Sequence, residues 1–344
     1  MKKSLFLPLV ALLSVVSCRP SQPIDHAVVD YNKDTYEIGI LQIAHFPALD
    51  SAKEAFQTAL SSSPLLSEKT LHFTYEVSNG DPSTQTTQAK SLVTKSDLLF
   101  GVATPSASAL KNARDEAGKK QPLLFTAVTD PVSASLMRAM QNHDGSVTGT
   151  SDDNPVENQI GLISSIFGDN LASVRLGILY TSSEINSEVQ ANRAQAEALR
   201  QGLAASNISI ATCDGSDDLS AVANNLINHS DVIYIPTDNN IADHMPTIKA
   251  ALHNTNTLCI VGEEGMLSGG HITYSVSYQV LGQKAGLMAA QILSGEALTE
   301  NIDAYKSLDP NEWNKVYSSD NLADSGYNLD TSLLPNGFID IDQE

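Results

Sequence analysis

Hydroxyl and carboxylate side chains directly follow five short apolar runs of this chain, and together they could bind a small charged molecule. The five segments are Ala103-Thr104-Pro105-Ser106, Thr129-Asp130-Pro131, Thr181 to Asn186, Pro236-Thr237-Asp238-Asn239 and Gly262-Glu263-Glu264-Gly265. Thr and Asp suit helix N-caps, and the free N–H groups of a first helical turn attract an anion. Asp130, Asp238 or Glu263 would hold a cation. A site with both features suits a zwitterion such as an amino acid, although each segment alone is more often only a helix cap.

The chain carries none of the common catalytic motifs. It has no G-x-S-x-G, no G-x-x-x-x-G-K-[ST] and no H-E-x-x-H segment, and its three cysteines form no C-x-x-C pair. We therefore expect no enzyme, no cofactor and no metal site. An exported enzyme that uses two cleft carboxylates as acid and base is the less favoured alternative. The net charge of −20 argues against nucleic acid as a partner, because that binding needs clustered Lys and Arg.

Strands and helices must alternate along the chain to bring these polar segments together. Predicted strands cover 36–43, 71–77, 98–102, 123–128, 175–180, 208–211, 232–235, 258–261 and 271–276. One predicted helix starts at Pro47, and the others cover 85–93, 105–117, 131–140, 186–205, 219–228, 239–252 and 278–293. Alternation of this kind predicts parallel sheets with helices on both faces, and ligands bind beyond the carboxyl ends of such strands. Because a turn-rich segment at 142–154 interrupts the rhythm, we expect two Rossmann-like lobes joined by a multi-crossing hinge, with one large doubly wound domain as the competitor.

The N-terminus indicates export and lipid attachment. Two lysines precede an apolar run from Leu5 to Val16, which is typical of a secretory signal peptide and too short for a membrane span. The run ends in Val15-Val16-Ser17-Cys18, which resembles the bacterial lipobox and implies acylation of Cys18. An ordinary signal peptide with a chance cysteine is the alternative. We expect an exported protein anchored to the cell membrane by lipid, on the periplasmic side or at the cell surface.

These observations give a domain plan. The predicted parts are a signal peptide at 1–17, a lipid-anchored tether at 18–35, lobe 1 at 36–147 and 277–300, lobe 2 at 148–276 and 301–335, and a frayed tail at 336–344. The sequence leaves open whether Cys213 and Cys259 pair, although the apolar run around Cys259 favours a buried free thiol. We expect the protein to be a monomer.

Five ordered motifs between residues 36 and 300 resemble the ABC-transporter substrate-binding lipoproteins of the tryptophan/tyrosine-binding type. They are Ile38-Gly-Ile-Leu-Gln-Ile-Ala-His-Phe-Pro-Ala-Leu-Asp50, Ala103-Thr-Pro-Ser106, Phe125-Thr-Ala-Val-Thr-Asp-Pro131, Thr181-Ser-Ser-Glu-Ile-Asn-Ser187 and Tyr234-Ile-Pro-Thr-Asp-Asn239. The resemblance implies a class I periplasmic-binding fold and delivery of a solute to a membrane permease. Several members of the family are associated with aromatic amino acids.

The resemblance also implies a set of ligand-binding residues. They are Gln42, His45, Thr104, Ser106, Thr126, Asp130, Ser182, Asn186, Asp238, Asn239, Glu263 and Tyr274. Two places depart from the family pattern: His45-Phe46 stands where a Glu before a His-Pro pair is common, and Ser275-Val276-Ser277 stands after Tyr274 where a Gly-x-Asp segment is common. One ring of His45-Phe46 could stack on an aromatic ligand, or Phe46 could be core and His45 surface. Trp313 is expected to pack in the C-terminal segment.

Transport is not the only function that this plan fits. A sensory lipoprotein that binds a nucleoside or another small metabolite is the alternative. We expect an amino acid, preferably aromatic, held between lobes that close over it, because charged contacts bind well only when they are desolvated.

Overall fold

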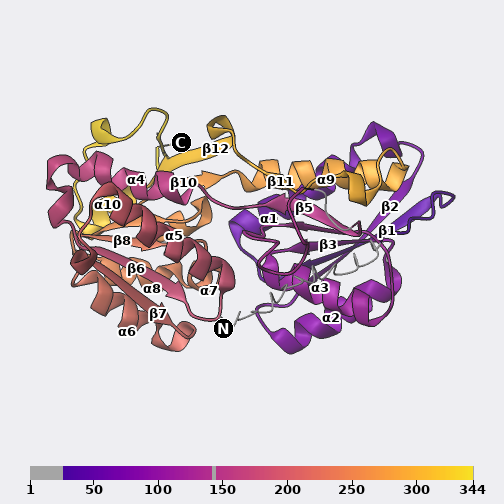
Figure 1. Cartoon of the computed structure of the whole chain (residues 1–344), viewed down its shortest axis with the longest axis horizontal. Coiled ribbons are helices and arrows are strands. Elements are labelled where there is room, and N and C mark those ends of the chain that lie inside the picture. Colours follow the sequence, from indigo (N-terminus) through magenta and orange to yellow (C-terminus); the bar gives the residue numbers. More distant parts are fainter. Residues whose placement is uncertain (1–25, 142–144, 344) are drawn as a thin grey trace, which may run out of the picture.

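The structure is a computed structural model that describes residues 26–141 and 145–343. Two α/β lobes lie side by side along the long axis, each with a central sheet and helices on both of its faces (Figure 1). This arrangement confirms the predicted fold class of two lobes with parallel sheets. Within the described residues, no helix is both long and apolar enough to cross a membrane.

Lobe 1 is built on a six-stranded sheet with the order β11-β5-β4-β3-β1-β2. Its elements are β1 (Thr35–Gln42), α1 (Pro47–Ser61), β2 (Thr70–Val77), α2 (Pro82–Lys95), β3 (Leu98–Val102), α3 (Thr104–Glu116), β4 (Leu123–Thr126), β5 (Val147–Ser151), α9 (Tyr278–Ser294) and β11 (Tyr305–Lys306). One apolar cluster packs α1 and α9 against one face of the sheet, and a second packs α2 and α3 against the other.

Lobe 2 is built on a seven-stranded sheet with the order β13-β12-β10-β9-β8-β6-β7. Its elements are α4 (Val156–Phe167), β6 (Leu176–Thr181), α5 (Ile185–Gln201), β7 (Ile208–Cys213), α6 (Ser216–Ile227), β8 (Val232–Ile235), α7 (Asn239–Asp243), α8 (Met245–Leu252), β9 (Leu258–Val261), β10 (Ile272–Val276), β12 (Trp313–Tyr317), α10 (Ser319–Ser325) and β13 (Ile339–Asp340). All pairings are parallel except that of β10 with β12.

Continuous apolar runs explain the central strands. Strands β3, β8 and β9 are buried at every position, as parallel strands must be when helices cover both faces. Small residues then bring α9 close to α1. A Cβ added at Gly282 would lie 2.0 Å from the carbonyl oxygen of Ala52, and one at Gly286 would lie 2.6 Å from that of Phe56. This close packing places the N-terminal ends of α1 and α9 together at the interface of the lobes.

The chain crosses between the lobes three times. The crossings are residues 152–155 between β5 and α4, Ser277 between β10 and α9, and residues 307–312 between β11 and β12. The first crossing begins within the turn-rich segment predicted at 142–154, but residues 147–151 form strand β5, which pairs with β4 in lobe 1. Strand β11 also pairs with β5. The predicted boundaries, which gave 148–151 and 305–306 to lobe 2, are therefore corrected.

Both ends of the body are better ordered than the sequence predicted. The amide of Val28 donates to the carbonyl of Lys120 over 2.7 Å, and Lys69 donates to the carbonyls of Tyr31 and Lys33. Residues 28–34 are therefore bonded to lobe 1 and are not part of a free tether. At the other end β13 pairs with β12, so 336–343 is not a frayed tail. Cys18 and the predicted signal peptide lie outside the described residues.

Two predicted helices differ from the structure. Residues 131–140 form turns, because Asp130 accepts hydrogen bonds from the amides of Val132 and Ser133, and Ser135 adopts a positive φ of 57°. The predicted helix 239–252 is divided into α7 and α8 at His244, just before Pro246. Cys213 and Cys259 are both buried free thiols, as expected for Cys259.

Candidate functional site

A narrow cleft lies between the lobes where the carboxyl ends of their strands meet. Its empty volume is about 370 Å³, a figure that includes its opening to solvent. The lining residues are Phe46, Ala48, Leu49, Ala127, Thr129, Asp152, Asn186, Thr237, Asp238, Asn239, Ala242, Glu263 and Tyr278. They come from both lobes, so closure of the lobes encloses whatever the cleft holds.

The N-terminus of α1 forms part of the lobe 1 wall. Phe46 is the N-cap residue and makes no side-chain capping bond, and Pro47 occupies the first helical turn. The first-turn amides of Ala48 and Leu49 therefore have no capping side chain, although both residues line the cleft. Such amides and the helix dipole favour an anion. We predicted this feature for α3, but residues of α3 do not line the cleft.

Backbone strain accompanies the strand ends of lobe 1. Ala103 follows β3 with a φ of 75°, and Ala127 follows β4 with a φ of 53°. An L-residue with a side chain costs roughly 1–2 kcal/mol in this left-handed region, and such strain clusters at ligand sites. The turn at Ala127 brings both Ala127 and Thr129 to the cleft wall.

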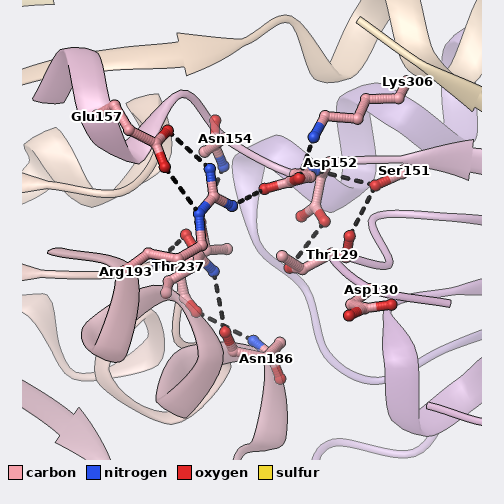
Figure 2. A network of polar contacts seen from close by, with 12 residues as sticks. Thr129, Asp130, Ser151, Asp152, Asn154, Glu157, Asn186, Arg193, Thr237 and Lys306 are labelled. Carbon is pink, nitrogen blue, oxygen red and sulfur yellow. Dashed lines mark hydrogen bonds and ion pairs between the residues drawn. The ribbon is translucent and has the colours of Figure 1, made fainter. Parts of the chain in front are cut away.

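Asp152 is a buried carboxylate that lines the cleft. Thr129 Oγ1 donates to Asp152 Oδ1 over 3.0 Å, and the Tyr278 hydroxyl donates to Oδ2 over 2.8 Å. Burial raises the pKa of Asp152 to about 6, against the lowering effect of these two hydrogen bonds. No Lys, Arg or His side chain in the described part of the chain pairs with it. Figure 2 shows Asp152 beside Thr129, at the start of the first crossing.

Glu263 is the corresponding buried carboxylate of lobe 2. It follows β9, and its Oε2 accepts one hydrogen bond of 2.9 Å from the amide of Gly265. Burial, together with the negative charge of Asp152, raises the pKa of Glu263 to about 7, against the lowering effect of the hydrogen bond from Gly265. It too has no cationic partner among the described residues. The cleft therefore holds two buried carboxylates from different lobes, and a cation between them would stabilise the charged form of both.

Asp238 lines the cleft, but its carboxylate already has partners within lobe 2. Oδ2 accepts from the amide of Thr181 over 2.7 Å, and Oδ1 accepts from the Thr181 hydroxyl and from the amide of Ile241, both over 2.9 Å. Glu184 accepts from the amides of Asn239 and Asn240. Burial and the charge of Asp238 raise the pKa of Glu184 to about 7. These two carboxylates occupy the amides at the start of α7, so they are bound by the protein itself.

A polar network continues from the cleft into lobe 2. Asn154 Nδ2 donates to Thr237 Oγ1 over 2.9 Å, and Asn186 Nδ2 donates to the carbonyl of Thr237 over 3.0 Å (Figure 2). Asn154 Oδ1 accepts from the amide of Val276 over 2.9 Å. The Asn154 side chain, in the first crossing, is thus hydrogen-bonded both to the segment that follows β8 and to the end of β10.

Of the predicted ligand residues, four line the cleft, namely Asn186, Asp238, Asn239 and Glu263. The other eight, which do not line it, are Gln42, His45, Thr104, Ser106, Thr126, Asp130, Ser182 and Tyr274. Several of them bond to lobe residues instead. The Gln42 side chain donates to Asp50, the Ser106 hydroxyl accepts from Gln85, and the Thr126 hydroxyl accepts from Thr150.

Asp130 and Ser182 likewise have local partners. Asp130 accepts from the hydroxyl of Ser133 and stands apart from the polar network in Figure 2, and Ser182 donates to Asp214 over 2.7 Å. Thr104 is half-buried in the first turn of α3. Asp130 therefore stabilises its own turn, whereas Ser182 joins the ends of β6 and β7.

The aromatic residues divide differently from the prediction. Phe46 is buried in the lobe 1 core and also lines the cleft, whereas exposed His45 pairs with Asp50. Tyr274 packs edge-on against Trp313 and Phe338 in the C-terminal part of lobe 2. Tyr278, the first residue of α9, lines the cleft instead.

Sequence reasoning missed four cleft residues with polar side-chain groups, namely Thr129, Asp152, Thr237 and Tyr278. Thr129 and Thr237 stood inside the strand-end segments that we had selected, one position before the carboxylates that we chose. Asp152 directly follows β5, and recognition of the Val-Thr-Gly-Thr-Ser run as a strand would have pointed to it. Within residues 26–141 and 145–343, no group of three or more His, Cys, Asp or Glu is arranged to hold a metal ion.

The chain is similar along most of its length to proteins with a known ligand or a known structure. The tyrosine-binding protein of Clostridioides difficile (strain R20291) is 30% identical over 293 residues, which cover 81% of this chain and 82% of that protein. The structure of an ABC domain from Streptococcus pneumoniae in complex with L-Trp is 27% identical, with a TM-score of 0.78 and coverage of 89% and 100%. A ligand-free, open substrate-binding protein with adhesive properties from Clostridium difficile is 28% identical, with a TM-score of 0.66 and coverage of 89% and 99%.

The family assignment rests on a match over most of the chain. The profile of the family described as ABC transporter substrate binding protein matches residues 37–311, which cover most of both lobes, the first two crossings and residues 307–311 of the third. Structures below 25% identity, such as a myo-inositol-bound solute-binding protein from Bacillus halodurans with a TM-score of 0.56, share the fold. This chain belongs to the ABC transporter substrate-binding protein family.

Proposed function

We propose that this protein captures an amino acid with an aromatic side chain in the cleft and delivers it to an ABC permease in the membrane. The observation that carries the proposal is the pair of buried carboxylates, Asp152 and Glu263, which face the cleft without a cationic partner among the described residues. An α-ammonium group between them would replace the missing charge. A buried carboxylate is costly unless such a partner neutralises it.

The rest of the cleft fits the other parts of such a ligand. The uncapped N-terminus of α1 offers the amides of Ala48 and Leu49 to a carboxylate. The rings of Phe46 and Tyr278 and the side chain of Leu49 form an apolar wall for the ligand side chain. Contact between an aromatic ligand ring and an aromatic side chain adds about 0.5–1.5 kcal/mol to the binding free energy, beyond the contribution of the buried apolar surface. The tyrosine-binding and L-Trp-bound relatives support the same ligand class.

Titration calorimetry of the full chain with Cys18→Ser tests this proposal with ligands that differ in one group. Three ligands share the indole ring. L-tryptophan carries both charged groups, tryptamine carries only the ammonium, and indole-3-propionate carries only the carboxylate. We expect L-tryptophan or L-tyrosine to bind tightest, tryptamine to bind more weakly, and indole-3-propionate to give no heat. Heat from nucleosides or sugars alone would contradict the proposal.

We also propose that Cys18 anchors the exported protein to the cell membrane through a lipid. The lipobox-like Val15-Val16-Ser17-Cys18 segment supports this, and the bonding of residues 28–34 to lobe 1 leaves 19–27 to connect the anchor with the body. Labelling of cells with radioactive palmitate should mark the wild-type protein and not the Cys18→Ser variant. Labelling of that variant would contradict the anchor. The released variant should sediment as a monomer.

A further inference from the structure

We propose that Asp153 is a positioning residue of the cleft, because its carboxylate joins one cation from each lobe and so holds the lobes closed over the solute. Asp153 pairs with Arg193 of α5 in lobe 2 and with Lys306 of β11 in lobe 1. It lies in the first crossing, directly after Asp152, which lines the cleft. The inference deepens the proposed function, on which its ligand measurements rest.

Each cation is fixed to its own lobe. Arg193 makes a bidentate pair with Glu157 of α4, with Nε 3.1 Å from Oε1 and Nη2 2.8 Å from Oε2. Helices α4 and α5 pack together in lobe 2. Lys306 pairs in register with Ser151 of β5, so its backbone moves with the lobe 1 sheet. A rotation that separates the lobes therefore moves Arg193 away from Lys306, and Asp153 cannot stay with both.

The three side chains are shielded enough for these pairs to matter. The exposed side-chain fractions are 17% for Asp153, 30% for Arg193 and 36% for Lys306. Exposed ion pairs contribute only about 0–1 kcal/mol, whereas partly buried pairs are screened less by salt. Two pairs that share one carboxylate are thus sufficient to shift an equilibrium between open and closed lobes.

The same crossing is tied directly to the cleft. Asp152 bonds to Thr129 and Tyr278, and Asn154 bonds to Thr237 and to the amide of Val276. Three consecutive side chains thus connect the cleft wall, the two lobes and the ends of β8 and β10. The structure also has a higher TM-score to the L-Trp complex, 0.78, than to the ligand-free, open relative, 0.66. The bridge at Asp153 is therefore seen in an arrangement closer to the ligand-bound one.

The test uses Lys306→Met, which removes one arm of the bridge without leaving Arg193 unpaired. Lys306→Arg is the conservative variant, and Lys90→Met is the matched control, because Lys90 pairs with Glu116 over 3.3 Å within lobe 1. Spin labels at Ser83→Cys on α2 and Asn225→Cys on α6 report the separation of the lobes, since these helices lie on different lobes (Figure 1). The background is Cys18→Ser, in which Cys213 and Cys259 are buried.

Two readouts separate a positioning role from a merely structural one. In pulsed electron resonance without ligand, we expect Lys306→Met to lengthen the label distance, and Lys306→Arg and Lys90→Met to leave it unchanged. In stopped flow with L-tryptophan, we expect Lys306→Met to raise the dissociation rate about three- to tenfold, with association changed by less than about twofold. Salt raised to about 1 M should reproduce both effects in the wild type, because it shortens the screening length to about 3 Å.

The outcomes are distinguishable. If Lys306→Met lowers the melting temperature but leaves the label distance and the dissociation rate equal to those of Lys90→Met, Asp153 has only a structural role and the inference is wrong. If neither L-tryptophan nor L-tyrosine binds but the label distance still lengthens in Lys306→Met, the proposed ligand is wrong while the role of Asp153 stands.

Discussion

The hydroxyl of Tyr278 donates a 2.8 Å hydrogen bond to Asp152, and this bond joins two of the three crossings between the lobes. Tyr278 is the first residue of α9, directly after the second crossing, and Asp152 begins the first crossing. Both side chains line the cleft, so one contact sets the geometry of the hinge and of the proposed ammonium site together. It also lowers the pKa of a carboxylate that burial would otherwise raise further.

Removal of this hydroxyl should weaken solute binding while the fold remains. Tyr278→Phe keeps the buried ring but takes one donor from Asp152, and hydrogen bonds to charged groups contribute about 1.5–3 kcal/mol. We expect the dissociation constant for L-tryptophan at neutral pH to rise about tenfold or more. Calorimetry measures it, with exposed Tyr31→Phe as the control. Equal affinity in Tyr278→Phe and the control would show that the bond does not support binding.

The charge of Glu263 should matter more for binding than for folding. Glu263→Gln keeps an oxygen that can accept the hydrogen bond from the Gly265 amide. The substitution removes a buried negative charge that has no cationic partner among the described residues. We expect L-tryptophan binding to weaken at least about tenfold, or about 1.4 kcal/mol, with a melting temperature at or above that of the wild type. The neighbouring Glu264→Gln is the control. A loss of stability without a loss of affinity would remove Glu263 from the site.

Affinity should fall as pH falls from about 8 to about 5.5. Burial raises the pKa of Glu263 to about 7 and that of Asp152 to about 6, so both groups take up protons in this window and lose attraction for an ammonium. The unliganded fold responds in the opposite direction. Carboxyl groups whose pKa is raised by folding stabilise the fold at low pH and lose that contribution as pH rises through the folded pKa.

A thermal-shift series tests this pH dependence with and without L-tryptophan. We expect the ligand-induced increase in melting temperature to grow with pH in the wild type and to be flatter in Glu263→Gln. A ligand-induced shift that shrinks as pH rises would mean that the ligand does not bring a cation to these carboxylates.

Asp238 should contribute mainly to the stability of lobe 2. Its carboxylate accepts three hydrogen bonds from Thr181 and Ile241. The side-chain amide of an Asn at this position has only one oxygen, so its NH₂ group would face at least one of these donors and that hydrogen bond would be lost. We expect Asp238→Asn to lower the free energy of unfolding by about 1–3 kcal/mol in urea denaturation. Exposed Asp217→Asn, at the start of α6, is the control. Wild-type stability with lost binding would instead assign Asp238 to the ligand.

Phe46 should select for aromatic ligands. It lines the cleft beside the uncapped start of α1, whereas Phe73 is a partly buried ring packed on the core of the same lobe away from the cleft. We expect Phe46→Ala to weaken the binding of L-tryptophan more than that of L-leucine, with the two losses of binding free energy differing by about 0.5–1.5 kcal/mol. Phe73→Ala should lower stability without changing the ratio of the two affinities. If Phe46→Ala leaves the ratio of the L-tryptophan and L-leucine affinities unchanged, Phe46 has no role in the selection of aromatic ligands.

Local patterns in the sequence determined the elements of this protein and the family resemblance. Apolar runs such as Leu98–Val102 and Leu258–Val261 become fully buried strands, because their side chains alone require cover on both faces. Polar residues after strands mark the edge of the sheet where the cleft forms. Glu263 and Asn186 could be selected on this basis, since both directly follow or open a predicted element.

Only the tertiary structure decided which polar groups face the cleft and which satisfy each other. Asp238 and Glu263 both follow buried strands of lobe 2, yet the first is bonded by Thr181 and Ile241 and the second keeps a single amide donor. Asp152 and Tyr278 are 126 residues apart and meet because two crossings converge. Sequence spacing determines which residues share an element, but hydrogen bonding and burial at a site depend on strand order and lobe closure, which are long-range properties of the packed chain.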